Sequence, residues 1–356
     1  MRVERIVAGR RAPPGLAGAI LTTDVVVGGS RWSKGRRLSE ADLAAYATEL
    51  NAGTVTVLVL EPGELHEDEA GLRLAAGVAG PGLHARGPVQ SRVDLLAAHG
   101  GVLHVRVAAL ERLNRVDRLE VFTGFDGSIV AAGDLVASVK IAPHVVEEAV
   151  LAAALRSVGS PARPIVRVDP FKAMRVAVVV KESVRASDQE RFERSVRDKV
   201  EGLGSTIAGI AYVADDDDAV TAAMAAVSRG PGRGRGAGRA GPADVVLTAG
   251  GRSTDPLDPF FVAIERLGGE VVRRGVPAHP GSMLWLGRIG RTAIMGLPTC
   301  GAYSKATAAD LVLPRLLTGE RPGRALVAGL GHGGLLTKDQ RFRFPRYARE
   351  LDAPDG

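Results

Sequence analysis

The sequence predicts an α/β protein: a three-layer, mostly parallel sheet with helices on both faces, preceded by an α+β N-terminal region. Apolar runs alternate with helix-like segments over residues 168–320, as in a parallel sheet covered on both faces. Residues 1–167 hold short β-like runs around one Ala/Leu/Glu-rich helix. The Pro/Gly-containing stretch Ser157–Pro164 marks a boundary between these parts. We therefore expect domains at 1–167 and 168–320, with a C-terminal tail at 321–356.

Length and composition indicate an ordinary globular chain. Its 356 residues favour two or three domains, and its 46% hydrophobic content is enough for real cores. The single cysteine, Cys300, excludes an internal disulfide and fits a reducing compartment. Apolar runs fall short of the roughly 18–20 residues that span a bilayer, and the first residues lack the apolar centre of a signal peptide. We expect a cytoplasmic protein with no membrane partner.

The net charge of +6 raises the question of nucleic acid. Most of the excess is arginine spread along the chain, which suits an anionic small molecule equally well. One local cluster, residues 229–242, lacks apolar periodicity and is expected to be a disordered insertion. It resembles an RNA-binding Arg/Gly tract, but a tolerated loop insertion is favoured because lengthening a loop costs little. RNA binding stays an alternative through Arg229, Arg233, Arg235 and Arg239.

Local signals in the first region predict individual elements. A helix is expected over Ser39–Leu50, with Ser39 as its cap and Asp42 answering in the first turn. Strands are expected at 55–60 and 102–107, and a strand–turn–strand unit around Gly133-Asp134.

The second region gives a regular series of elements. Strands and helices alternate from Arg175 onward, so ligands are expected at the carboxyl ends of the strands. The expected strands are 175–180, 206–213, 244–248, 270–273 and 292–295, and the expected helices are 188–203, 217–227, 257–267 and 302–317.

The strongest local motif is the stretch Thr248–Pro259, which follows a buried strand and opens a helix. Gly250 and Gly251 let the backbone approach a ligand closely, and the helix start favours an anion such as phosphate. The glycine spacing fits neither the dinucleotide fingerprint nor a Walker loop. The motif therefore predicts a phosphate site of another kind.

Acidic residues near this motif have two interpretations. Asp255 and Asp258 could cap the helix, since aspartate accepts from free N–H groups and proline suits the first helical position. Alternatively, one carboxylate binds Mg²⁺ that bridges to phosphates. The run Asp215–Asp218 is likewise either a helix start favoured by the helix dipole or a second source of Mg²⁺ ligands.

Two further loops are expected at the same sheet edge as Gly250. They are His279–Ser282 and Gly296–Gly301, and each follows a strand-like run. Cys300 has no base beside it in sequence, so we do not expect a nucleophile. Lys305 offers either a point charge for phosphate or a solvated helix residue.

Three motifs follow one another along the chain: DVVLTAGGRS, PGSMLWLG and AIMGLP. In this order they resemble the molybdopterin-binding domain shared by molybdopterin molybdotransferase and molybdopterin adenylyltransferase. The resemblance covers about Met174–Leu317. It implies molybdopterin as ligand or substrate and Mg²⁺ as cofactor. We expect catalysis by Asp258, which the resemblance matches, and by Asp255 beside it, and metal binding by Asp258, Asp215 and Asp216. The residues expected to bind the ligand are Gly250, Gly251, Ser253, Pro280, Gly281, Gly296 and Pro298, together with Cys300, Ser304 and Lys305, which a second resemblance described below adds.

Departures from the molybdotransferase pattern bear on the activity. Pro256 stands where that family has glutamate, Cys300-Gly301 replaces Gly-Asn-Pro, and Lys181-Glu182-Ser183 replaces Thr-Gly-Asp-Glu at a strand end. The Asp-Gly-Tyr-Ala motif of the N-terminal part is absent. The segments GAILTTDVVV, KGRRLSEADL, LEPGELHEDEA, GDLVASVKIAP and GLGHGGLL, with site loops at Cys300 and Ser304-Lys305, carry a second resemblance. Through them the chain is similar, nearly end to end, to the binding half of proteins that join this domain to a molybdenum-cofactor nucleotidyltransferase.

These resemblances leave the activity open. One interpretation is Mg²⁺-dependent molybdate insertion into adenylylated molybdopterin. Another is a non-catalytic carrier, or a partner of a cofactor nucleotidyltransferase, that holds a small pterin phosphate or nucleotide. Because relatives form dimers or trimers, we also expect a homo-oligomer.

Overall fold

The structure is a computed structural model, and it describes residues 1–158, 163–181, 186–229, 241–298 and 306–349. The contacts within the chain define two compact units. The main division follows Val168, one residue beyond the expected N-terminal region. The first unit comprises Met1–Ala98, His104–Asp126 and Ala132–Val168, and the second comprises His99–Leu103, Gly127–Ala131 and Asp169–Gly356.

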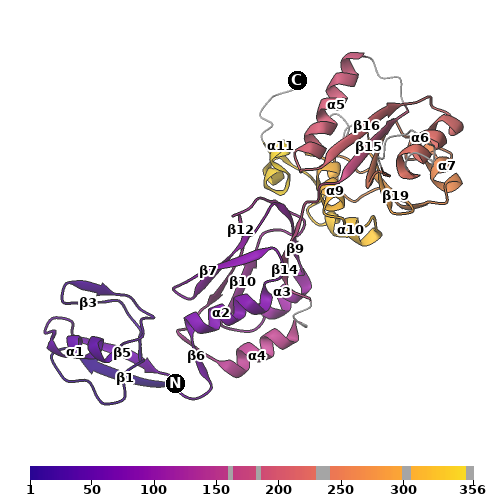
Figure 1. Ribbon diagram of the computed structural model, residues 1–356. Coiled ribbons are helices and arrows are strands. Elements are labelled where there is room, and N and C mark those ends of the chain that lie inside the picture. The colour runs from indigo at the N-terminus through magenta and orange to yellow at the C-terminus, as the bar shows by residue number, and fades with distance from the viewer. Residues whose placement is uncertain (159–162, 182–185, 230–240, 299–305, 350–356) are drawn as a thin grey trace. The chain divides into compact units, whose positions relative to one another are not determined.

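The first unit begins with small antiparallel sheets around one helix (Figure 1). Ser39 and Asp42 form the expected capping box at the start of α1 (Glu40–Thr48). Apolar side chains such as Trp32 and Tyr46 are buried against these strands. The three-stranded sheet has the order β1-β5-β2, from Arg2–Val7, Thr54–Val59 and Ile20–Leu21, and β3 (Val25–Val27) pairs with β4 (Ser30–Trp32).

The rest of this unit packs helices onto a four-stranded antiparallel sheet. The sheet has the order β10-β12-β8-β7, from Leu119–Thr123, Leu135–Ile141, Arg92–Ala97 and Leu83–Val89. The helices are α2 (Glu67–Val78), α3 (Val107–Asn114) and α4 (Glu148–Ser157), and β6 (Glu64–His66) pairs with β13 (Val145–Glu147).

The turn at Gly133-Asp134 separates two strands, as expected, but these strands belong to different sheets. Strand β11 (Ile129–Val130) pairs with β9 (Gly101–Val105), in a sheet ordered β11-β9-β14 that includes β14 (Val166–Pro170). Strand β12 pairs instead with β10 and β8. The turn therefore carries the chain from one sheet to another.

A six-stranded sheet forms the centre of the second unit. Four strands, β16, β15, β17 and β20, run parallel, and β19 and β18 complete the sheet in antiparallel pairs. In sheet order they are Thr206–Tyr212, Arg175–Val180, Val245–Ala249, Thr292–Gly296, Trp285–Ile289 and Glu270–Arg274. The mostly parallel sheet of the sequence prediction is confirmed.

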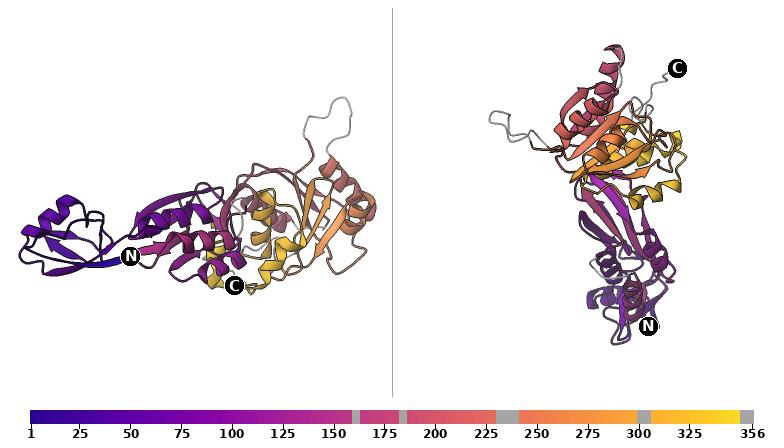
Figure 2. Two further views of the ribbon diagram at one scale, coloured as in Figure 1. Left: turned by 90° about the horizontal axis from the view of Figure 1, so that it is seen from below. Right: turned by 90° about the vertical axis from the view of Figure 1, so that its right-hand side faces the viewer.

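Helices cover both faces of this sheet (Figures 1 and 2). One core lies between the sheet and α5 (Ala186–Glu201) and α9 (Ala308–Leu317). The opposite core includes Phe260 and Trp285 and packs α6 (Asp217–Arg229) and α7 (Pro259–Arg266). These two apolar layers confirm the three-layer α/β prediction.

The expected C-terminal tail packs into the first of these cores. Leu326, Leu330 and Phe344 are buried there with residues of the sheet. Their elements are α10 (Arg324–Ala328), the 3-10 helices η1 (Gly329–Gly331) and η2 (Lys338–Arg343), and α11 (Arg346–Arg349). Within the described ranges, no helix is long and apolar enough to cross a bilayer.

Most of the Arg/Gly tract expected as a disordered insertion lies outside the described residues. Its two described ends are Arg229, the last residue of α6, and Gly241. The first part of the expected 302–317 helix also lies outside them, and α9 starts at Ala308 because Thr307 caps it.

Candidate functional site

Two of the expected site loops lie side by side at the carboxyl edge of the sheet. Strands β17 and β20 pair in parallel with Thr248 opposite Gly296. Beyond that pair, the Leu297 amide donates to the Thr248 carbonyl over 2.8 Å. The loop that begins at Gly250 and the loop that begins at Leu297 therefore leave the sheet together, as the sequence predicted.

The Pro280-Gly281 loop reaches the same edge by a different route. It leads into β19, whose first residue, Trp285, pairs with Gly296. The Pro280 carbonyl accepts from the Ala308 amide at the start of α9 over 2.9 Å. Gly281 has a φ of +104°, and a Cβ there would lie 2.8 Å from the Ala308 nitrogen. This position requires glycine because the loop lies against the helix backbone.

Packing against Trp285 requires a glycine at position 296. A Cβ on Gly296 would lie 1.9 Å from the Trp285 Nε1 atom. Trp285 is itself buried between the rings of Phe260 and Phe261, with centroid distances of 6.4 and 5.0 Å. The tryptophan ring thus lies directly under the end of β20.

Asp258 is the N-cap of α7. Its Oδ1 atom accepts from the Phe260 amide over 3.0 Å, and Pro259 occupies the first helical position. The side chain is buried, at 2% exposure, and its Oδ2 atom accepts from the Arg252 amide over 2.6 Å. In the same loop, Asp255 Oδ1 accepts from the Leu257 amide over 2.9 Å. The capping role expected for these aspartates is filled by Asp258, whereas Asp255 accepts within the turn that precedes the helix.

A buried lysine lies between Asp258 and Asp215. Lys181 directly follows β15, and its Nζ atom lies 2.6 Å from Asp215 Oδ1 and 3.0 Å from Asp258 Oδ2. Its side chain is fully buried, and the ammonium lies 5.7 Å from the centre of the Phe260 ring. Lys181 therefore joins the loop after β16 to the loop after β17.

Asp215 and Asp216, two acids of the Asp215–Asp218 run, accept further hydrogen bonds. Asp215 Oδ2 accepts from Arg252 Nη2 over 3.2 Å. Asp216 Oδ1 accepts from the Asp218 and Ala219 amides over 3.0 and 2.9 Å, as the cap of α6. The assignment of Asp215, Asp216 and Asp258 to Mg²⁺ stays a prediction.

A second buried ion pair fixes the start of α9. Lys199 Nζ lies 2.5 Å from Asp310 Oδ1, and both side chains are fully buried. Asp310 also accepts from the Thr307 amide over 2.9 Å and from the Tyr347 hydroxyl over 3.1 Å. Burial, reinforced by the charge of Asp310, raises the pKa of Tyr347 well above its usual value.

The C-terminal segment contacts the Pro280-Gly281 region. His279 and Leu335 form a parallel bridge, in which the His279 amide donates to the Gly334 carbonyl over 2.8 Å. The Leu336 amide donates in turn to the His279 carbonyl over 2.8 Å. His279 is thus held by backbone pairing beside the expected ligand loop.

Three expected ligand residues, Cys300, Ser304 and Lys305, lie outside the described residues. Ser253 lies in the described loop between Arg252 and Asp255 and is partly buried. Sequence reasoning did not select Lys181 or Arg252 as site residues. The sequence marks Lys181 only by its position, directly after the apolar run RVAVVV and before Glu182, and not by any partner nearby.

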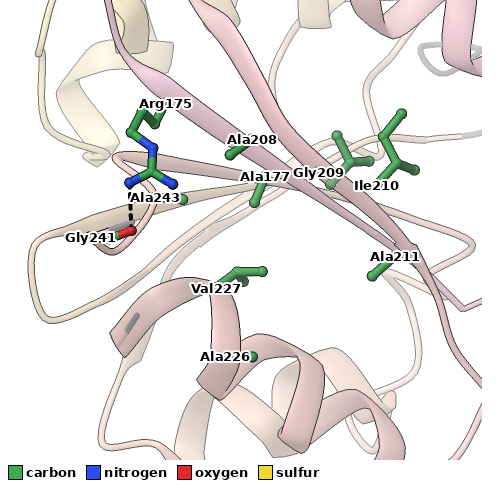
Figure 3. Close-up of a pocket in the computed structure, with 11 residues that line it drawn as sticks. Arg175, Ala177, Ala208, Gly209, Ile210, Ala211, Ala226, Val227, Gly241 and Ala243 are labelled. Atoms are coloured by element: carbon green, nitrogen blue, oxygen red, sulfur yellow. Dashed lines mark hydrogen bonds between the residues drawn. The ribbon is translucent and has the colours of Figure 1, made fainter. Parts of the chain in front are cut away.

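The cavity in Figure 3 is separate from this site. It has a volume of about 240 Å³ and is lined mainly by small apolar residues of β15, β16 and α6. At its polar end, Arg175 Nη1 donates to the Gly241 carbonyl over 2.8 Å. Arg175 opens β15, so that end of the cavity lies toward the amino ends of the strands. The expected ligand loops lie at the opposite end of the sheet.

The fold and its loops define an α/β domain with glycine-containing loops gathered at the carboxyl edge of a parallel sheet. Residues 177–318 match the model of a family described as "Probable molybdopterin binding domain". The match covers nearly the whole segment for which the motifs implied this family. The match includes every strand of the central sheet beyond the first two residues of β15.

Solved structures of low identity were also found. A molybdenum cofactor biosynthesis protein B is 20% identical, with a TM-score of 0.31, and the match covers 42% of this chain and 96% of that chain. The molybdopterin biosynthesis enzyme MoaB of Thermus thermophilus is 20% identical, with a TM-score of 0.29 and coverages of 42% and 98%. A molybdopterin biosynthesis MoeA protein of Pyrococcus horikoshii is 17% identical, with a TM-score of 0.30 and coverages of 72% and 81%. No curated protein matches the chain.

Proposed function

We propose that this chain binds molybdopterin, or its nucleotide form, and serves molybdenum-cofactor biosynthesis in the cytoplasm. The observation that carries the proposal is the family match of residues 177–318, whose three glycine-containing loops lie at one sheet edge. Ligands of parallel α/β sheets bind at this edge.

Arg252 is the residue that we expect to meet the phosphate of the pterin. Its side chain is 61% exposed and comes from the loop that follows β17. A guanidinium binds phosphate oxygens through two parallel N–H donors. The salt bridge to Asp215 holds this guanidinium beside the sheet edge, which reduces the ordering needed when a ligand binds.

Two forms of this proposal differ in chemistry. In the catalytic form, Mg²⁺ held by Asp258 with Asp215 or Asp216 assists molybdate insertion into adenylylated molybdopterin, and Asp255 contributes to the same site. In the carrier form, the chain shields the pterin and transfers it to a partner such as a molybdenum-cofactor nucleotidyltransferase. The geometry favours the carrier, because amides and cations already engage the carboxylates of Asp258 and Asp215.

The test is to express the chain in a molybdopterin-producing host, purify it, oxidise the bound pterin and measure its fluorescence. We expect pterin to accompany the wild type and to fall at least roughly tenfold in Arg252→Ala, because a bidentate charged contact is lost. Arg288→Ala is the matched control, since Arg288 is also an exposed, carboxylate-paired arginine but lies on β19, away from the loops. Wild-type protein that carries no pterin, and gains none on incubation with molybdopterin, would contradict the proposal.

Turnover and salt dependence separate the alternatives. Molybdate insertion by the purified chain would favour the catalytic form over the carrier. An RNA affinity that falls steeply with salt would favour the Arg/Gly tract as the functional element. We also propose a homo-oligomer, which light scattering after size exclusion tests directly.

A further inference from the structure

The buried lysine of the site lies where a divalent cation would be expected. Lys181 Nζ stands between Asp215 Oδ1, at 2.6 Å, and Asp258 Oδ2, at 3.0 Å. These are two of the carboxylates that the family resemblance implies as metal ligands. The ammonium has no exposed surface, so it cannot leave the carboxylates without a rearrangement of both loops.

The oxygens of these carboxylates are already engaged. Asp258 accepts two backbone amides in addition to the lysine, and the second oxygen of Asp215 pairs with Arg252. The positive charges of Lys181 and Arg252 therefore balance the negative charges of Asp215 and Asp258. Mg²⁺ needs oxygen ligands at roughly 2.0–2.1 Å in octahedral geometry and usually keeps several waters. A dication placed here would meet Lys181 at close range with no free carboxylate oxygen.

The same conclusion follows from the donors around the site. Across the described ranges, no group of three or more His, Cys, Asp or Glu side chains is arranged to hold a metal ion. Asp216 does not supply a third ligand because its carboxylate caps α6. The residues present at this edge do not fit Mg²⁺.

We propose that Lys181 is a fixed ammonium that replaces the divalent cation at this site. It ties the loop after β16 to the loop after β17, and ligand binding at this edge is independent of metal. Lys181 acts as a positioning residue, because it is buried and holds Asp215, which in turn orients the exposed guanidinium of Arg252. The identity of the ligand rests on the proposed function, but the exclusion of the metal does not.

The experiment measures Mn²⁺ binding to the pterin-free full-length chain by electron paramagnetic resonance, with Mn²⁺ as a substitute for Mg²⁺. We expect no stoichiometric binding to the wild type. Lys181→Ser removes the ammonium, leaves two carboxylates and makes room for an ion. It should bind one Mn²⁺ at least roughly 100-fold more tightly than the wild type, and its melting temperature should rise with Mn²⁺.

Two further variants make the result specific. Lys181→Ser/Asp258→Asn should lose the gained site, which separates it from adventitious binding at the exposed Asp218. Lys199→Ser is the matched control: it also removes a buried lysine from an aspartate, but Asp310 keeps donors from Thr307 and Tyr347. It should lose stability without rescue by Mn²⁺.

One stoichiometric Mn²⁺ on the wild type that is lost in Asp258→Asn would overturn the proposal, whether or not Lys181→Ser folds. Pterin retention that needs added Mg²⁺ and is abolished by EDTA would also overturn it. Failure of the wild type to carry any pterin would instead refute the proposed function and leave the metal result standing.

Discussion

Asp258 caps α7 and neutralises Lys181 with one carboxylate. Asparagine retains the acceptor that a cap needs but not the charge. The sequence alone predicts that Asp258→Asn costs well under ~1 kcal/mol. The buried ammonium changes this expectation to about 2–4 kcal/mol, because removing one partner from a buried pair leaves an under-compensated charge while Asp215 still compensates part of it.

Urea unfolding measures this difference. Asp255→Asn is the control, since Asp255 also accepts a backbone amide, from Leu257, and has no ion pair among the described residues. It should change the unfolding free energy by less than ~1 kcal/mol. Equal effects of the two substitutions would show that the charge of Asp258 is unimportant for stability.

Tyr347 makes the stability of the second unit sensitive to alkaline pH. Burial raises the pKa of its hydroxyl above the usual 10.0, so the folded state retains the proton after the unfolded chain has lost it. This contribution is complete below pH 10 and is lost as the pH rises toward the folded pKa. Tyr347→Phe should cost about 1–2 kcal/mol at about pH 8, because a hydrogen bond to Asp310 is removed.

The gap between wild type and Tyr347→Phe should therefore narrow at about pH 10.5 relative to about pH 8, as followed by urea unfolding. A gap of the same size at both pH values would mean that the hydroxyl does not titrate differently in the folded chain.

Residues such as Lys181 were beyond sequence reasoning for a physical reason. A lysine after an apolar strand is usually solvated, and its burial depends on two loops that are 34 and 77 positions further along the chain. The glycines and prolines of the loops were found because turn chemistry is local. The partners of the lysine were not, since ion pairing between distant loops leaves no local pattern.

Among the loops, the Pro280-Gly281 turn is the most constrained. Gly281→Ala should cost at least about 2 kcal/mol, because alanine there has both an unfavourable φ and a contact with the Ala308 backbone. Gly290→Ala is the control, with a φ of +56° and open space around it, and should cost only about 1–2 kcal/mol.

Thermal unfolding and pterin retention should be measured on both glycine variants. Gly281→Ala should lower both, whereas Gly290→Ala should lower only the melting temperature. Unchanged pterin retention in a folded Gly281→Ala protein would separate this loop from the ligand site.

At the level of elements, the parallel strands were predictable and β19 was not. The run Arg175–Val180 matches β15 because a wholly apolar stretch is typical of a central parallel strand. Strand β19 (Trp285–Ile289) is absent from the strands that the sequence predicts. Its signal was the two-residue turn Gly290-Arg291, in which a glycine with positive φ joins paired Ile289 and Thr292.

For the whole second unit, the C-terminal residues matter more than the sequence indicated. The sequence predicts that Met174–Leu317 folds alone. That fragment lacks Leu326, Val327, Leu330 and Phe344, which are buried in the core. Their burial contributes up to roughly 6–12 kcal/mol of transfer free energy, which is comparable to the net stability of a domain.

We therefore expect the fragment 174–317 to lack a cooperative thermal transition and the fragment 169–349 to have one. Circular dichroism on heating measures both. A cooperative transition of equal midpoint in the two fragments would show that the C-terminal elements are dispensable for folding.

The hydrogen bond from Arg349 Nη2 to the Ile129 carbonyl, at 2.8 Å, joins residues 220 positions apart. Ile129 belongs to the second unit although it is synthesised well before the main part of that unit. A ribosome must therefore translate the 220 residues that separate Ile129 from Arg349 before this contact forms, and the exit tunnel delays it further. The Gly127–Ala131 segment is therefore synthesised long before the Arg349 side chain that contacts it, although both belong to the second unit.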